Sequence, residues 1–329
     1  MNNDHLLRQR AIDFTHKKIR MSRFEHSTQQ QDMTLPSNCG DFGRIHHFKL
    51  HPSKNWIDNP LPHLPVCTYF NIPIPEVLPV QLFQLSVCNI NCWYCFVDKK
   101  LRAGHPKHSD FCSPKDLLEK ARAENQPRVI VLSGGQPDLV PEYNLWFLQS
   151  RQELGMEKSH FIWTDDNLST DLFFQTMTAD QMDYMRSRPG YARVGCLKGF
   201  DAVSAAFNTR TNLSFFDEQM RRLKQLTQIG FDQYAYVTLT TPDVDQIDKR
   251  IGHFLDRIQT EIGPDFPLKM VPLEIYKYAV NAGRYKDLAA QNQYVALKSW
   301  IREMNIRFQT KIRHNDTLIR RLSHANEHV

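Results

Sequence analysis

Strand-like and helix-like segments alternate six times between residues 79 and 305. Each short run of β-branched, aromatic and other apolar residues is followed by a longer segment with helical hydrophobic spacing. Such alternation is typical of a parallel sheet covered by helices, so we expect an α/β fold whose chemistry lies at the carboxyl ends of the strands. The predicted strands are 79–87, 128–135, 160–165, 191–199, 233–241 and 267–274, and the predicted helices are 113–124, 142–155, 170–186, 215–230, 244–263 and 294–305.

The composition is that of a globular protein, with 41% hydrophobic and 23% charged residues. The net charge of +5, from 41 basic and 36 acidic residues, gives no reason to expect nucleic-acid binding. No apolar run approaches the ~20 residues that span a bilayer, so we expect no membrane association. The first 18 residues lack the apolar segment of a secretory signal, which favours a cytoplasmic location where thiols stay reduced.

The chain divides into three parts by composition and hydrophobic pattern. Residues 1–77 are polar and proline-interrupted, so we expect an irregular N-terminal extension, a possible lid, with one short amphipathic helix near residues 6–19. The predicted core spans residues 78–275, and residues 276–329 form a C-terminal extension. The N-terminal extension has scattered metal-binding residue types without a typical ligand spacing, so ordinary packing or surface roles are expected for Cys39, His46, His47, His51 and Cys67.

Three of the seven cysteines, Cys88, Cys92 and Cys95, lie within eight residues just past the first predicted strand. Their C-x3-C-x2-C spacing lacks the second pair that is typical of structural zinc sites. Thiolates are the usual ligands of a [4Fe–4S] cluster, and three of them leave one iron open for catalysis. We therefore favour an iron–sulfur cluster, with a zinc site and three inert thiols as the alternatives.

The segment CNINCWYC (88–95) resembles the C-x3-C-x-aromatic-C signature of the radical S-adenosylmethionine (radical SAM) superfamily. The segment VLSGGQPDL (131–139) resembles the GGEP motif at the end of the second barrel strand of that family. The resemblance implies a partial (β/α)6 TIM-like barrel over roughly residues 78–275. It also implies a [4Fe–4S] cluster on the three cysteines, S-adenosyl-L-methionine at the open iron, and an external one-electron donor of flavodoxin or ferredoxin type. Reductive cleavage then gives a 5′-deoxyadenosyl radical that abstracts hydrogen from the substrate.

The same resemblance suggests cofactor contacts near the first two strands. It places Tyr94 near the adenine, and it lets the backbone of Gly134 and Gly135 approach the methionine ammonium closely. Gln136 departs from the family, where Glu is commoner at this position. Backbone contacts survive that change, whereas a carboxylate–ammonium pair does not.

The later strands end in further candidates. The segment WTDDN (163–167) resembles the TNG region of activating-type members, so Thr164, Asp165 and Asp166 are candidates for ribose or methionine contacts. A cluster that caps the next helix explains these residues equally well. Val271 is a candidate wall residue beside the adenine, and simple core packing is its alternative.

The segment CLKGFD (196–201) is similar to a DLKG pattern in the activating-enzyme branch. Lys198 is therefore a candidate catalytic-site contact to the carboxylate of S-adenosylmethionine or of the substrate, or else a solvated lysine. Cys196 is a candidate hydrogen-atom donor of the kind that epimerase-type members use. Its alternative role is that of a small buried apolar residue.

Together these patterns are nearest to the pyruvate formate-lyase activating-enzyme branch, whose members generate a glycyl radical on a partner protein. The N-terminal extension argues against that use, because it could cap the barrel and enclose a smaller substrate. We expect a radical SAM enzyme that acts on an unidentified small molecule or peptide. A radical activase and a non-catalytic iron–sulfur or zinc protein are the alternatives.

Overall fold

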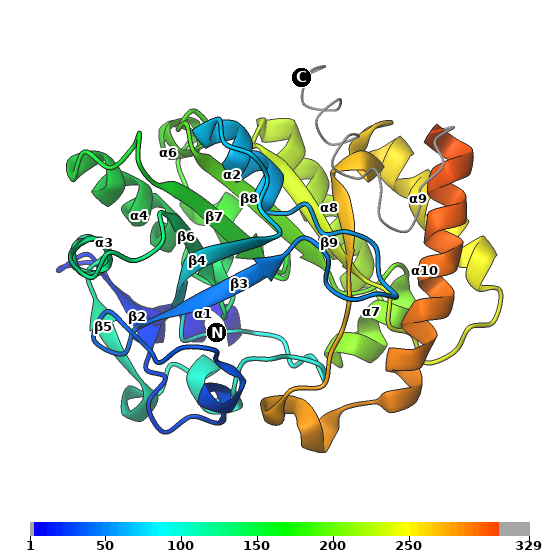
Figure 1. Ribbon diagram of the computed structural model, residues 1–329, viewed down its shortest axis with the longest axis horizontal. Helices are drawn as coiled ribbons and strands as arrows, with labels where there is room; N and C mark the ends of the chain where they lie inside the picture. Colours follow the sequence, from blue (N-terminus) through cyan, green and yellow to red (C-terminus); the bar gives the residue numbers. More distant parts are fainter. Residues whose placement is uncertain (1–2, 309–329) are drawn as a thin grey trace.

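The computed structural model describes residues 3–308, and its main feature is a curved sheet of seven strands (Figure 1). Six strands run parallel in the order β4-β6-β7-β8-β9-β10, and β3 pairs with β4 in the antiparallel sense at one edge. The α/β fold and the partial TIM-like barrel are thereby confirmed. The strands are β3 (Gly43–Lys49), β4 (Val77–Gln84), β6 (Val129–Ser133), β7 (Phe161–Asp166), β8 (Tyr191–Leu197), β9 (Gln233–Thr238) and β10 (Met270–Leu273).

Helices cover the outer face of this sheet (Figure 1). The predicted helix 170–186 is two helices, because Thr178 begins the second one with a capping box to Gln181. The predicted helix 294–305 lies within α10, and residues 309–329 of the predicted C-terminal extension lie outside the described residues. The helices are α3 (Pro114–Ala123), α4 (Glu142–Glu153), α5 (Leu172–Thr176), α6 (Ala179–Arg186), α7 (Ala202–Thr209), α8 (Phe215–Ile229), α9 (Ile247–Glu261) and α10 (Asp287–Phe308).

Residues alternate between the two faces along each strand, which separates two apolar clusters. The outer cluster joins the strands to the covering helices and includes Ile130, Ile162 and Val237. The inner cluster includes Val131, Trp163 and Tyr236, together with Leu64 and Val66 of α2 (His63–Phe70). Helix α2 therefore packs against the inner face of the barrel, on the side opposite to the other helices.

The N-terminal extension carries more regular structure than its prolines suggest. Helix α1 (Asn3–Ala11) leads into β1 (Ile12–Asp13) and β2 (Lys18–Ser22), and β2 pairs with β5 (Ser109–Cys112) in a small second sheet. The predicted helix near residues 6–19 therefore ends early. Because β3 continues the main sheet, the N-terminal extension contributes a strand to the same layer as the expected core. The predicted domain limits at residues 77 and 275 stay predictions.

The open side of the barrel, between its edge strands β3 and β10, is bridged by residues 53–61. Ser53 Oγ donates to Glu274 Oε1 at 3.0 Å, just past the end of β10. Trp56 Nε1 donates to the carbonyl oxygen of Pro272 at 2.9 Å. These bonds join segments more than 200 residues apart, and they connect the two edges of the sheet through the N-terminal extension.

Candidate functional site

The three clustered cysteines lie in the loop that follows β4, at the carboxyl end of the parallel barrel. Cys92 is 5% exposed, while Cys88 and Cys95 are half-buried. The pKa of the Cys92 thiol is raised to about 12, chiefly by burial and also by the neighbouring Cys95 and Cys88, against the lowering effect of Lys198. The predicted cluster ligands are therefore close enough in space to interact electrostatically.

Two arginines hold the backbone of this loop. Arg102 Nη1 donates to the carbonyl oxygen of Ile90 at 2.7 Å. Arg284 donates to the carbonyl oxygens of Trp93 and Cys95, at 3.0 and 2.7 Å. Charge-assisted bonds of this kind fix the loop and place two cations beside the thiols. Neither arginine was singled out by the sequence analysis, because an isolated Arg gives no sign of burial.

The donor set fits an iron–sulfur cluster. Within residues 3–308, no group of three or more His, Cys, Asp or Glu side chains is placed to hold a single metal ion. A [4Fe–4S] cluster takes one thiolate on each of several irons, so its ligands surround the cluster and do not converge on one point. The thiols, together with the flanking cations Arg102, Arg284 and Lys198, suit a bulky anionic group better than a mononuclear zinc ion.

The glycines of the SGGQP turn are required by packing against the chain that leads to Cys88. A Cβ on Gly135 would lie 2.3 Å from the carbonyl oxygen of Val87 and 2.5 Å from that of Leu85. Gly134 has a φ of +87°, and its Cβ would lie 2.2 Å from the side chain of Gln84. These contacts explain both glycines without a ligand, so their approach to a methionine ammonium stays a prediction.

Gln136 is fully buried and its side chain is bonded within the protein. Its Nε2 donates to Asp166 Oδ1 at 2.6 Å, and its Oε1 accepts from the backbone N–H of Asn167 at 2.9 Å. Asp166 also pairs with the buried Arg193, as does Asp138. Desolvation and the nearby Asp166 raise the pKa of Asp138, whereas Arg193 lowers it. This network lies on the outer face and locks the turn to β7 and β8.

Only one of the three candidates on β7 faces the barrel interior. Thr164 donates to Asn144 of α4 at 3.2 Å, so it points outward like Asp166. Asp165 lies on the inner face, where it accepts from Ser133 Oγ at 2.7 Å and from Trp163 Nε1 at 2.8 Å. The positions of Thr164 and Asp166 give no support to cofactor contact, which stays an untested prediction for both. Alternation along the strand is the signal that separates them from Asp165.

Asp165 and Lys198 are two of the charged residues on the inner face. Burial raises the pKa of Asp165 to about 6, against the opposing effects of its two hydrogen bonds and of Lys198. Burial lowers the pKa of Lys198, whereas the ionised forms of the neighbouring Cys196, Tyr94 and Cys92 raise it. Within the described residues the Lys198 ammonium has no hydrogen-bond or ion-pair partner, which leaves it free to bind an anion.

The remaining candidates also lie on the inner face. Tyr94 is hydrogen-bonded through its hydroxyl to Thr238 Oγ1 at 3.1 Å. Cys196 on β8 and Val271 on β10 both lie opposite Tyr236, which is on β9 between these two strands. Burial raises the pKa of Cys196 to about 12, so it is a neutral thiol.

Two segments cover the carboxyl end of the barrel. Asp32 of the N-terminal extension accepts from the backbone N–H of Ala279 at 2.9 Å. Asn281 Nδ2 then donates to the carbonyl oxygen of Tyr94 at 2.9 Å. Gln29 Nε2 donates to Gln84 Oε1, at the end of β4, at 3.1 Å. In Figure 1 the blue N-terminal segment, the cyan cysteine loop and the orange segment before α10 lie together at the bottom of the view.

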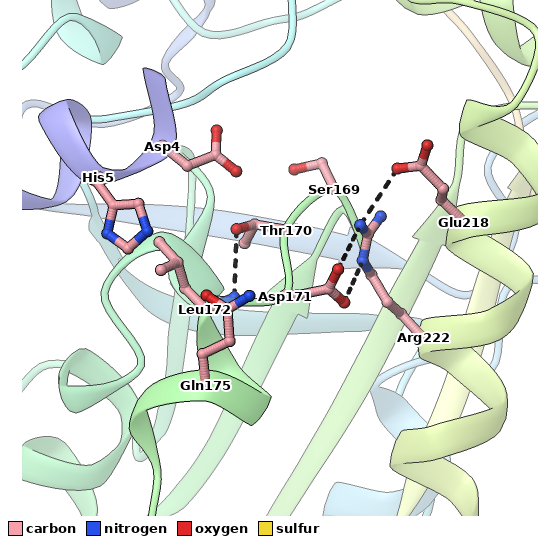
Figure 2. Close-up of a pocket in the computed structure, with 9 residues that line it drawn as sticks. All are labelled: Asp4, His5, Ser169, Thr170, Asp171, Leu172, Gln175, Glu218 and Arg222. Carbon is pink, nitrogen blue, oxygen red and sulfur yellow. Dashed lines mark hydrogen bonds and ion pairs between the residues drawn. The ribbon is translucent and has the colours of Figure 1, made fainter. Parts of the chain in front are cut away.

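A separate polar cavity of about 200 Å³ lies between α1, α5 and α8 (Figure 2). On one wall of the cavity, Arg222 bonds to both Asp171 and Glu218. None of the predicted site residues lines it. The histidines of the extension are also dispersed, since His47 bonds to Thr34 and His51 to Asp58.

Comparison with protein-family models gives no match, and comparison with curated proteins gives none either. Among solved structures, SuiB of Streptococcus suis bound to precursor peptide SuiA is 16% identical, with a TM-score of 0.39, over 56% of this chain and 37% of that chain. SuiB bound to S-adenosylmethionine is 16% identical over 56% of this chain and 38% of that chain, with a TM-score of 0.38. The match thus spans well under half of SuiB. Likenesses of this size carry no conclusion about activity.

No helix in residues 3–308 is both long enough and apolar enough to cross a membrane.

Proposed function

We propose that this protein is a radical SAM enzyme that acts on a small molecule or a peptide. The observation that carries the proposal is the position of Cys88, Cys92 and Cys95 at the carboxyl end of a parallel partial barrel. That end is where barrel enzymes place their chemistry. When bound there, a [4Fe–4S] cluster and S-adenosyl-L-methionine would supply a 5′-deoxyadenosyl radical that abstracts hydrogen from the substrate.

The chain's own residues would hold and insulate these groups. The three thiolates would hold the cluster, and Arg102 and Arg284, which bond to the loop, would offset its negative charge. Trp93 is fully buried and donates from Nε1 to Asn208 at 2.9 Å, so it keeps water from one side of the loop.

Side chains on the inner face would orient the S-adenosylmethionine. Lys198, whose amine has no hydrogen-bond or ion-pair partner within the described residues, would bind the carboxylate of the methionine moiety. Asp165 accepts from the ribose hydroxyls, and Tyr94 and Val271 flank the adenine. Cys196 holds a thiol hydrogen beside the same space, as a later hydrogen donor to a substrate radical requires.

The covered barrel end supports a small substrate over a partner protein. Residues 28–32 and 279–284 both hydrogen-bond across the carboxyl end, and the second segment also holds the cysteine loop. A glycine loop of a large partner would have to displace them. An external one-electron donor of flavodoxin or ferredoxin type, in the cytoplasm, completes the proposal.

The test is anaerobic reconstitution with iron and sulfide, followed by dithionite and S-adenosylmethionine. We expect iron to bind and 5′-deoxyadenosine to form. Both are lost in a variant with Cys88→Ala, Cys92→Ala and Cys95→Ala, and both are kept in the matched control Cys112→Ala. Cofactor cleavage by the triple variant would refute the cluster assignment, and a chain that binds no iron would refute the whole proposal.

A further inference from the structure

Arg44, on β3, is a buried cation without a counter-ion. Its Cα pairs with that of Leu82, which belongs to the inner apolar cluster, so the Arg44 side chain lies on the inner face. It is 6% exposed. Within residues 3–308 its guanidinium makes no hydrogen bond or ion pair, and its Nε is fully buried. Burying a guanidinium whose Nε has no partner is unfavourable, and an anion that the chain itself does not supply would offset that cost.

The neighbours of Arg44 leave its guanidinium fork free. The Cζ atom lies 5.7 Å from the ring centroid of Phe96, which follows the third clustered cysteine directly. The charged or ionisable groups that act on Arg44 are Tyr278 and Asp165. Asp165 is within electrostatic range but more than 4.0 Å away, and its oxygens accept from other donors. His46, two residues further along the inner face of β3, is neutral because burial lowers its pKa to about 3.

Arg44 lies on a different strand of the sheet from the one that leads to Lys198, the residue proposed to bind the methionine carboxylate. Lys198 acts electrostatically on Cys88, Cys92 and Asp165, so it lies beside the thiols. Arg44 is on β3, whereas Lys198 follows β8, and strands β7, β6 and β4 lie between these two strands in the sheet. Asp165 is within electrostatic range of both cations, Lys198 after β8 and Arg44 on β3. Two separate anionic groups fit this arrangement, and the methionine carboxylate accounts only for the one at Lys198.

We propose that Arg44 binds an oxyanion of the substrate, a carboxylate or a phosphate, on the inner face of the barrel. That the anion belongs to a substrate rests on the proposed function, whereas the anion site stands on geometry alone. A guanidinium matches either group with two parallel N–H donors, and the hydroxyl of Tyr278 can add a third. The substrate class is thus an organic acid or a phosphate ester. Its anionic group would bind the Arg44 guanidinium, which lies beside Phe96.

The anion site is tested with the reconstituted full chain by anaerobic thermal unfolding in acetate, phosphate and chloride at equal ionic strength. We expect acetate or phosphate to raise the midpoint by about 2 °C or more over chloride. The rise persists in Lys49→Met, which removes an exposed cation from the same strand, and it disappears in Arg44→Met. Arg44→Lys, which keeps the charge, retains part of it. The oxyanion that acts identifies the group. An equal rise in Arg44→Met, or no rise in the wild type with either oxyanion, overturns the site.

Calorimetric titration with S-adenosylmethionine separates substrate from cofactor. We expect Arg44→Met to bind S-adenosylmethionine within about twofold of wild type and Lys198→Met to lose at least about tenfold, which corresponds to one charge-assisted contact. A tenfold loss in Arg44→Met instead would assign Arg44 to the cofactor and overturn the substrate assignment. If no 5′-deoxyadenosine forms but the oxyanion still raises the unfolding midpoint, the proposed function is wrong and the anion site is still supported.

Discussion

Gln136 donates from Nε2 to Asp166 Oδ1 at 2.6 Å, in the buried network that ties the glycine turn to β7. The motif that this turn resembles more often has Glu where this chain has Gln136. The structure gives a reason for the departure, because a second carboxylate here would face Asp166 at hydrogen-bond distance. Amide and carboxylate are complementary, while two carboxylates must share a proton.

Gln136→Glu should therefore destabilise the protein by about 3 kcal/mol at pH 7, because it buries an unpaired charge. The loss should shrink toward pH 5, since the introduced carboxyl, once protonated, could again donate to Asp166. Urea unfolding at the two pH values measures it, with the exposed Gln152→Glu on α4 as control. A loss that does not change with pH would show that the network tolerates two charges.

Cys92→Ala should abolish S-adenosylmethionine cleavage and lower the iron content of the reconstituted protein. The reason is that the cluster would lose its most buried ligand. Iron analysis and the 5′-deoxyadenosine assay report the two effects separately. Full cleavage by this variant would sink the assignment of Cys92 as a ligand.

Gly135→Ala should loosen the loop that carries the cysteines. The new methyl group would lie 2.3 Å from the Val87 carbonyl oxygen, so the backbone must move, and we expect a loss of about 2 kcal/mol or more together with weaker iron retention. Gly263→Ala is the matched control, because the nearest atom to its methyl would be 4.0 Å away. Equal behaviour of the two variants would contradict the packing argument.

Asp165 should make stability fall as the pH rises from about 4 to 6. Its folded pKa of about 6 lies above the ordinary value of 3.8, so the native state binds more protons than the unfolded state in that window. The shift corresponds to at most about 3 kcal/mol. Unfolding of the metal-free chain at pH 4.5 and pH 7 should show Asp165→Asn gaining on wild type as the pH rises. A constant difference between the two would disprove the shift.

Cys196→Ala should leave 5′-deoxyadenosine formation largely intact, because the thiol is proposed to act only after the cofactor is cleaved. The same assay, run beside the Cys92→Ala variant, is sufficient. Loss of cleavage would instead make Cys196 a structural residue or a cofactor contact.

The sheet was predictable because apolar and β-branched runs identify buried strands without tertiary information. Each predicted strand of the barrel is present, with its end shifted by a few residues. Strand β3 and helix α2 were not predicted. The β3 segment contains Arg44, His46 and His47, whose polarity hides the strand, and proline-rich flanks hide α2.

Within the site, the spacing of the cysteines in the sequence was sufficient to predict them as a cluster. No pattern in the sequence predicted the arginines around them. Arg44, Arg102 and Arg193 are all at least nine-tenths buried, and nothing local in the sequence distinguishes them from solvated arginines. Their burial depends on strands and loops that meet only in the folded chain. Asp165 and Asp166 were separable in principle, since neighbouring strand residues face opposite sides.

The bridge from Ser53 and Trp56 to the end of β10 has a consequence for biosynthesis. A ribosome makes these residues some 200 positions before their partners Glu274 and Pro272 exist. The N-terminal extension therefore lacks these two hydrogen bonds until the last strand of the barrel has been synthesised. Contacts of such sequence separation slow folding, so this chain should complete its native structure late in synthesis or after release.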